Sequence, residues 1–115
     1  MSTPIDITFN IHYNHLMSAQ KDCCQLNLQS LAKALQTISE PNRLKILCLL
    51  RRGDRCVCQL EAALKLKHNL ICHHLKALSK LGLLKSQSQG NFTFYSLNTK
   101  TYKVLLTGIN KVLGD

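Results

Sequence analysis

The chain lacks the long apolar run, about 18 residues, that a helix needs to cross a bilayer. The segment Met1–Met17 has no basic cluster followed by an apolar block, which is the pattern of a secretory signal. Internal repeats, low-complexity tracts and linkers are also missing. These absences exclude a membrane-spanning protein and favour a cytoplasmic one.

Acidic residues are scarce. Six Asp and Glu face fifteen Lys and Arg, which gives a formal net charge of +9. Between residues 43 and 85 the only acidic side chains are Asp54 and Glu61. The basic residues of that segment are Arg43, Lys45, Arg51, Arg52, Arg55, Lys65, Lys67, Lys76, Lys80 and Lys85. Because such a surface attracts polyanions, and nucleic acid is the usual partner of a compact basic domain, the charge predicts binding to double-stranded DNA.

A chain of 115 residues, of which 45% are hydrophobic, has the size and the apolar content of one folded domain. Residues 1–24 show no clear period and are expected to form an N-terminal arm that carries the Cys23-Cys24 pair. Residues 25–115 are expected to form the DNA-binding domain. A domain this small buries a modest share of its surface, so pairing through an apolar helix would stabilise it.

Apolar residues recur at helical spacing in four consecutive segments, which predict helices over about 28–38, 41–53, 56–64 and 67–81. Pro41 suits the first turn of the second helix, and Gly53 and Gly82 suit the ends of the second and fourth. Cys48 lies in an apolar run of the second helix and is expected to be buried in the core.

After these helices the pattern changes to two short strands, 83–88 and 92–97, around the turn Gln89-Gly90-Asn91. A last amphipathic helix over 102–113 is expected to begin at Asn98 or Thr99. Two short helices followed by a hairpin are typical of a winged helix-turn-helix. The predicted fold is therefore mainly α with a small β-hairpin.

The fourth helix has one apolar face and one polar, basic face. His74 lies on the apolar face and is expected to be packed and hydrogen-bonded. The polar face offers donors and acceptors for base edges and charges for phosphates, although any single lysine could equally be solvated. The predicted DNA-binding residues are Lys67, His68, Asn69, Cys72, His73, Lys76 and Lys80 on the helix, with Lys85, Gln89 and Asn91 on the wing.

Several motifs together carry a family resemblance. They are Ser39-Glu40-Pro41-Asn42-Arg43-Leu44-Lys45-Ile46-Leu47, Cys56-Val57-Cys58-Gln59-Leu60, His73-His74-Leu75-Lys76-Ala77-Leu78 and Gly82-Leu83-Leu84. In combination they resemble the ArsR/SmtB family of metal-responsive transcriptional repressors, over about residues 28–97. The resemblance implies a homodimer, built by the first and last helices, that occupies an inverted-repeat operator and leaves it when a metal or metalloid binds.

The resemblance also implies a thiolate site at Cys-Val-Cys, and some family members add cysteines from the N-terminal arm. This chain departs from the arsenic-sensor pattern because Glu61 stands where a third cysteine would follow. It also has Lys65 and Lys67 where the family favours Gly and Ser, which leaves the turn less well specified. The family's other site, of His and carboxylates on the last helix, is not expected, since residues 102–113 contain no His, Asp, Glu or Cys.

The cysteines themselves suggest soft-metal chemistry, because paired thiols in a reducing compartment bind metal or react with oxidants more often than they form structural disulfides. Cys56 and Cys58 could bind one ion together only at a helix start or with local distortion of the helix, and the sequence places them at a helix start. We predict metal ligation by Cys56, Cys58, Cys23 and Cys24, with the arm from the same or the other protomer. Thiolates select As(III), Cd(II) or Pb(II), with Zn(II) less favoured, and counting cysteines does not separate these ions.

Other functions remain open at this point. The same fold could be switched by oxidation of Cys56 and Cys58 or of the Cys23-Cys24 region, and Cys72 could sense oxidation or simply occupy a serine position. A metal carrier that binds no DNA is a different class that the cysteines also allow. An enzyme is not expected, because no nucleophile has an orienting base and oxyanion donors at a recognisable spacing.

Overall fold

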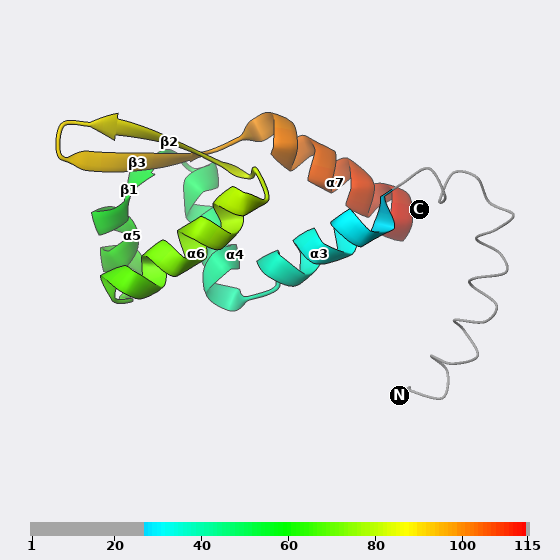
Figure 1. Cartoon of the computed structure of the whole chain (residues 1–115), viewed down its shortest axis with the longest axis horizontal. Coiled ribbons are helices and arrows are strands. Elements are labelled where there is room, and N and C mark those ends of the chain that lie inside the picture. The colour runs from blue at the N-terminus through cyan, green and yellow to red at the C-terminus, as the bar shows by residue number, and fades with distance from the viewer. Residues whose placement is uncertain (1–26, 115) are drawn as a thin grey trace, which may run out of the picture.

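The computed structural model describes residues 27–114, which form five helices and a small antiparallel sheet (Figure 1). The sheet extends at one end of the molecule, and the first and last of these helices lie together at the other. The elements in chain order are α3 (Leu28–Ile38), α4 (Pro41–Arg51), β1 (Arg55–Cys56), α5 (Val57–Leu64), α6 (His68–Lys80), β2 (Leu84–Gln89), β3 (Phe92–Leu97) and α7 (Thr99–Leu113). The predicted winged helix-turn-helix is confirmed. None of the described helices is long and apolar enough to cross a membrane.

Three of the helices, α3, α4 and α7, begin at residues whose side chains satisfy the first backbone N–H groups. Asn27 accepts a hydrogen bond from the Ser30 N–H at 3.0 Å and so starts α3. Glu40 accepts from the Asn42 and Arg43 N–H groups at 2.6 and 3.0 Å and starts α4. Asn98 starts α7, as its sequence position predicted. The helix boundaries therefore follow from capping chemistry that is readable in the sequence.

The sheet has the order β1-β3-β2, with both pairs antiparallel. The hairpin of β2 and β3 turns at Gly90, whose φ of +63° suits a residue without a Cβ. The first strand was not predicted. Arg55 and Cys56 pair with Tyr95 and Phe94 of β3. The wing, which is the hairpin of β2 and β3, is therefore attached directly to the start of α5.

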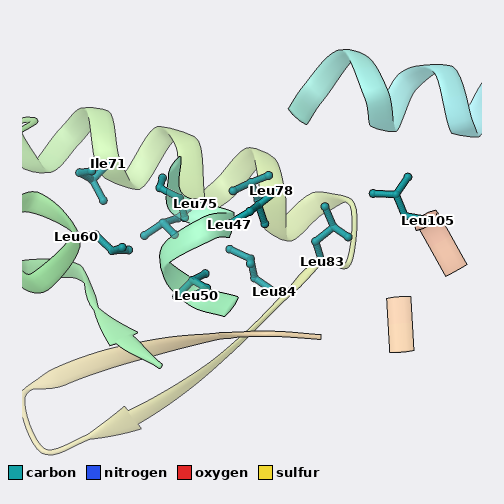
Figure 2. Close-up of a cluster of buried hydrophobic side chains, with 10 residues drawn as sticks. Leu47, Leu50, Leu60, Ile71, Leu75, Leu78, Leu83, Leu84 and Leu105 are labelled. Atoms are coloured by element: carbon teal, nitrogen blue, oxygen red, sulfur yellow. The ribbon is translucent and has the colours of Figure 1, made fainter. Parts of the chain in front are cut away.

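The core lies between α4, α5, α6 and the base of the wing (Figure 2). Its fully buried side chains are Ile46, Leu60, Ile71, Leu75, Leu78 and Leu83. Burying one such side chain contributes about 1.5–3 kcal/mol, so this cluster fixes the orientation of α6 against α4 and α5. His74 is buried with this face of α6, as predicted.

The prediction for Cys48 is wrong, because its side chain is exposed. Helix α4 buries Ile46, Leu47 and Leu50, and position 48 falls on another face of the helix. Leu44, 48% exposed, and Leu70, 41% exposed, also face away from the core, although both follow the apolar spacing of their helices. A continuous apolar run carries no information about which residue faces the core.

Candidate functional site

Cys56 lies at the junction between the wing and the helix-turn-helix. It is the second residue of β1 and the residue that precedes α5, and its side chain is only 5% exposed. Its backbone N–H donates to the Gln59 Oε1 at 2.9 Å, which closes the first turn of α5. A ligand held at Cys56 would therefore act on the sheet and on α5 together.

Cys58 lies in the first turn of α5, and the structure pairs its sulfur with that of Cys56 as a disulfide, with Cα atoms 5.4 Å apart. The side chains of residues two apart on a regular helix diverge. They meet here because Cys56 has an extended backbone and lies just before the helix, whereas the sequence predicted it as the first helical residue. Two sulfur atoms at one helix start can hold a soft ion when both are reduced.

The two other predicted ligands, Cys23 and Cys24, lie outside the described residues. Within residues 27–114, no group of three or more His, Cys, Asp or Glu side chains is placed to hold a metal ion. The described part of the chain thus offers two candidate thiol ligands, Cys56 and Cys58. A soft ion with three or four ligands requires more donors, from the arm or from elsewhere.

Helix α5 packs against α6 in the core, so the position of one helix depends on that of the other. Leu60 of α5 and Ile71 of α6 are both fully buried, and Figure 2 shows them pointing into the same cluster. A polar contact joins the same two helices at the surface, where the His68 Nδ1 lies 2.6 Å from the Glu61 Oε2. A shift of α5 must therefore move α6 or break these contacts.

The side chains predicted to read DNA lie on the outer face of α6 and on the wing. All of them are exposed except Cys72, which is half-buried. Gln89 and Asn91 flank the turn of the hairpin, far from the base of the wing (Figure 1). The exposed Phe92 lies beside them at this tip. The structure brings a basic helix face and a protruding hairpin into one molecule, as a winged helix-turn-helix requires.

The turn between α5 and α6 contains two features that bear on the start of α6. Lys65 adopts a left-handed conformation with φ of +56°, which glycine adopts at lower cost. Lys67 precedes α6 as its N-cap residue but makes no side-chain capping hydrogen bond. These are the positions at which the sequence departs from the family pattern, so both departures weaken the turn.

Arg43 of α4 connects three elements and was not recognised in the sequence. Its Nε donates to the His74 Nδ1 at 3.0 Å, and its Nη1 donates to the Thr37 carbonyl at 3.1 Å. The remaining nitrogen, Nη2, lies 3.4 Å from the His73 Nε2. The guanidinium therefore ties the end of α3 and the start of α4 to the middle of α6. A separation of 31 residues between Arg43 and His74 hides this contact from local patterns.

Helices α3 and α7 leave an apolar groove of about 860 Å³ between them and the end of α6. Its lining includes Leu31 and Ala34 of α3 and Val104 and Gly108 of α7. Val104 is 67% exposed, and Leu106 and Leu113 on the same helix are 48% and 71% exposed. These are the two helices that were predicted to build a dimer, and they expose the apolar surface such an interface needs.

Comparison with known proteins gives consistent results. The profile described as "Bacterial regulatory protein, arsR family" matches residues 40–86, from the start of α4 into β2. A homologue of the cadmium resistance transcriptional regulatory protein CadC from Staphylococcus aureus is 30% identical over 88% of this chain and 84% of its own length. An arsenical resistance operon repressor of Staphylococcus xylosus is 33% identical over 64% of this chain and 70% of its own.

Solved structures show the same architecture. The crystal structure of a possible transcriptional regulator for arsenical resistance superposes with a TM-score of 0.67 at 26% identity. The superposition covers 72% of this chain and 86% of that one. The similarity therefore extends over most of both folds.

Proposed function

Because the chain belongs to the arsR family of bacterial regulatory proteins, we propose that it is a homodimeric repressor that a thiophilic metal or metalloid releases from DNA. Membership also makes it a transcriptional regulator rather than an enzyme. The repressor occupies an inverted-repeat operator while the ion is absent. The inducing ion is As(III), Cd(II) or Pb(II), with Zn(II) less favoured, bound by Cys56 and Cys58 with Cys23 and Cys24.

The observation that carries this proposal is the meeting of two sulfur atoms at the start of α5. This helix immediately precedes α6, which is the proposed DNA-reading helix. Thiolates are soft anionic donors and select soft ions over hard ones. The relatives named for cadmium and arsenical resistance support the same class of inducer. Ligands recruited from the arm complete the coordination that two thiolates leave open.

The mechanism is a coupling free energy between the thiolate site and the DNA face. Cys56 lies in β1, which pairs with the wing, and α5 packs on α6 through Leu60 and Ile71. Drawing the sulfur atoms around an ion displaces α5 and the base of the wing. Helix α6 and the wing of each protomer then no longer fit two successive major grooves together.

The groove between α3 and α7 supports the homodimer. The exposed apolar surface of α7, including Val104, would be covered by the same helices of a second copy. A twofold arrangement places two α6 helices on one side, which matches an inverted repeat. Release then requires only a small change in the relative position of two reading helices.

The test is operator binding of the reduced dimer, measured by fluorescence anisotropy with each of the four ions. The native chain should bind operator without metal, and the inducing ion should weaken binding by roughly 5–150-fold. Cys56→Ser should bind operator with unchanged affinity and lose release by metal, because serine starts a helix well but does not ligate soft ions.

Cys48→Ser is the matched control, since Cys48 is an exposed free thiol on α4 that the proposal does not use. It should behave as the native chain does. Full release by metal in Cys56→Ser would contradict the proposed site.

A redox switch is the second candidate, and the Cys56–Cys58 disulfide favours it. Closing or opening this bond would move the same helix start that metal binding moves. Titration under strict reduction separates the two candidates, because a redox switch does not respond to metal there. A chain that binds no DNA site at moderate salt would instead be a metal carrier.

A further inference from the structure

Three side chains outside the Cys56–Cys58 site form a connected set between α5 and α6. The Cys72 Sγ lies 3.4 Å from the His68 Nε2, and the His68 Nδ1 lies 2.6 Å from the Glu61 Oε2. His68 and Cys72 are four residues apart on α6 and so share one face, while Glu61 reaches them from α5. The imidazole is held between a carboxylate and a thiol.

These two contacts assign a different role to each ring nitrogen of His68. A carboxylate only accepts hydrogen bonds, so the contact with Glu61 requires the proton on Nδ1. The Nε2 of the neutral ring is then free to accept the S–H of Cys72. The Glu61 contact thereby fixes both the tautomer and the ring orientation that suit proton removal from the thiol. A nucleophile, a base and a group that orients the base are the parts of an activated thiol.

We infer that Cys72 is a peroxide-reactive thiol, with His68 as its proton acceptor and Glu61 as the residue that positions His68. The Sγ proton moves to the His68 Nε2, and the thiolate attacks one oxygen of hydrogen peroxide. An S–O bond forms as the O–O bond breaks, and the departing hydroxide takes the proton from His68 to become water. The sulfur is oxidised to a sulfenic acid by two electrons, and peroxide is reduced.

The environment of the thiol suits a small neutral oxidant. Cys72 is half-buried and carries no disulfide, so its side chain is only partly shielded from a molecule of the size of hydrogen peroxide. His68, with its side chain 64% exposed, can exchange its proton with solvent. The reaction uses neither of the Cys56 and Cys58 sulfur atoms. Oxidation of Cys72 is therefore a second way to regulate the protein through a thiol, separate from the proposed metal site.

The position of Cys72 gives the reaction a consequence that rests on the proposed function. Cys72 shares the outer face of α6 with Asn69, His73 and Lys76, which are proposed to meet DNA. An added oxygen on its sulfur changes both the shape and the hydrogen bonding of that face. Oxidation of Cys72 should consequently weaken operator binding without any metal.

The full-length reduced chain provides its own reference thiol for the test. Cys48 is also free and is the more exposed of the two. Trypsin separates them, since Cys48 falls in the peptide 46–51 and Cys72 in the peptide 68–76. Hydrogen peroxide is added, sulfenic acid is trapped with dimedone, and both peptides are quantified over time by mass spectrometry.

Exposure alone predicts faster reaction at Cys48, whereas an activated thiol predicts the opposite. Cys72 should be trapped at least about tenfold faster than Cys48, a conservative fraction of what a positioned base contributes. His68→Asn should reduce the Cys72 rate to that of Cys48, and Glu61→Gln should reduce it by a smaller factor. The Cys48 rate should stay constant in both variants, and far-UV circular dichroism checks that they remain folded. A Cys72 rate at or below that of Cys48, or one unchanged by His68→Asn, would overturn the inference.

Operator binding is read in the same samples. Peroxide should weaken binding by the native chain and by Cys48→Ser, and Cys72→Ser should resist it. Equal loss of binding in Cys72→Ser would overturn the link between Cys72 and DNA. Failure of the untreated chain to bind any operator would count against the proposed function alone, because the trapping rates require no DNA.

Discussion

His74 shows how one residue couples protonation to stability. Its side chain is 4% exposed, its Nδ1 accepts from Arg43, and its Nε2 has no hydrogen-bond partner among the described residues. Burial lowers the pKa of His74, the Glu40 carboxylate partly opposes this, and the charges of Arg43 and His73 lower it further. Protonation would place a second positive charge against the Arg43 guanidinium. The native fold therefore depends on a neutral imidazole at this position.

The pH dependence of stability follows from the direction of that shift. The unfolded chain protonates His74 near its ordinary pKa of 6.5, and the folded chain does so only at lower pH. The stabilisation is present above that value and is lost as the pH falls through the folded pKa. We expect the free energy of unfolding, measured with urea, to fall between about pH 7.5 and pH 5.5 by less in His74→Gln than in the native chain.

Glutamine suits this experiment because its Oε1 can still accept from Arg43 and it does not titrate. His73→Gln is the matched control, since His73 is the exposed neighbour and its charge is the smallest of the influences on the pKa of His74, so most of the native pH dependence should remain. Backbone N–H groups of Arg43 and Asn42 hold the pKa of Glu40 below its ordinary value, although desolvation opposes this. Its effect therefore falls at more acidic pH. An unchanged pH dependence in His74→Gln would contradict the account of His74.

Predictions from sequence succeed at the residue scale where spacing alone decides the outcome. The burial of His74 follows from its place on the apolar face of α6, and the meeting of Cys56 and Cys58 follows from their place at a helix start. Cys48 was placed wrongly because its apolar surroundings in the sequence do not define a face. The contacts of Arg43 could not be predicted, since they depend on how α4 packs against α6.

At the scale of elements, the start of α6 is held less firmly than the start of α3, α4 or α7. Its N-cap residue Lys67 makes no side-chain hydrogen bond, and Lys65 in the same turn has a positive φ. A lysine at the N-cap also places a positive charge at the positive end of the helix dipole, which is unfavourable. The same lysine, however, places a positive charge at the edge of the surface proposed to bind DNA.

Lys67→Ser should therefore separate stability from DNA binding. A serine N-cap should raise the free energy of unfolding by about 0.5–2 kcal/mol. Loss of one phosphate contact per protomer should weaken operator binding and make the slope of log K against log salt shallower by about 0.9 for each contact. Urea denaturation and anisotropy over a range of salt concentrations measure the two effects.

Lys100→Ser is the matched control for this exchange. Lys100 is exposed in the first turn of α7, which Asn98 already caps, and it lies outside the predicted reading face. It should change neither stability nor the salt slope to the same extent. Equal salt slopes for Lys67→Ser and the native chain would remove Lys67 from the DNA interface.

The elements themselves were largely predictable because their ends carry chemical signals. Asn98, Pro41 and Gly82 mark helix boundaries, and the polar turn around Gly90 marks the hairpin. Strand β1 was missed, since two residues are too short to show any period and their pairing depends on β3. This omission matters for function because β1 connects Cys56 to the wing.

At the scale of the whole molecule, the chain is organised as two ends joined by one core. The wing and the α5–α6 pair lie at one end, and the α3–α7 groove lies at the other (Figure 1). Arg43 and the leucine core connect the two ends. A displacement of α5 would therefore also displace α6 and the helices that would form a dimer. In the proposed function, this connection would convert ligand binding into altered spacing between the two α6 helices of a dimer.

The most direct measurement is a Cd(II) titration of the reduced dimer bound to labelled operator, with sulfur-to-cadmium charge-transfer absorbance and anisotropy recorded in the same sample. The account predicts that both signals change together and reach their end points at one ion per protomer. Charge-transfer absorbance that saturates while the operator stays fully bound would show that thiolate ligation and DNA release are not coupled.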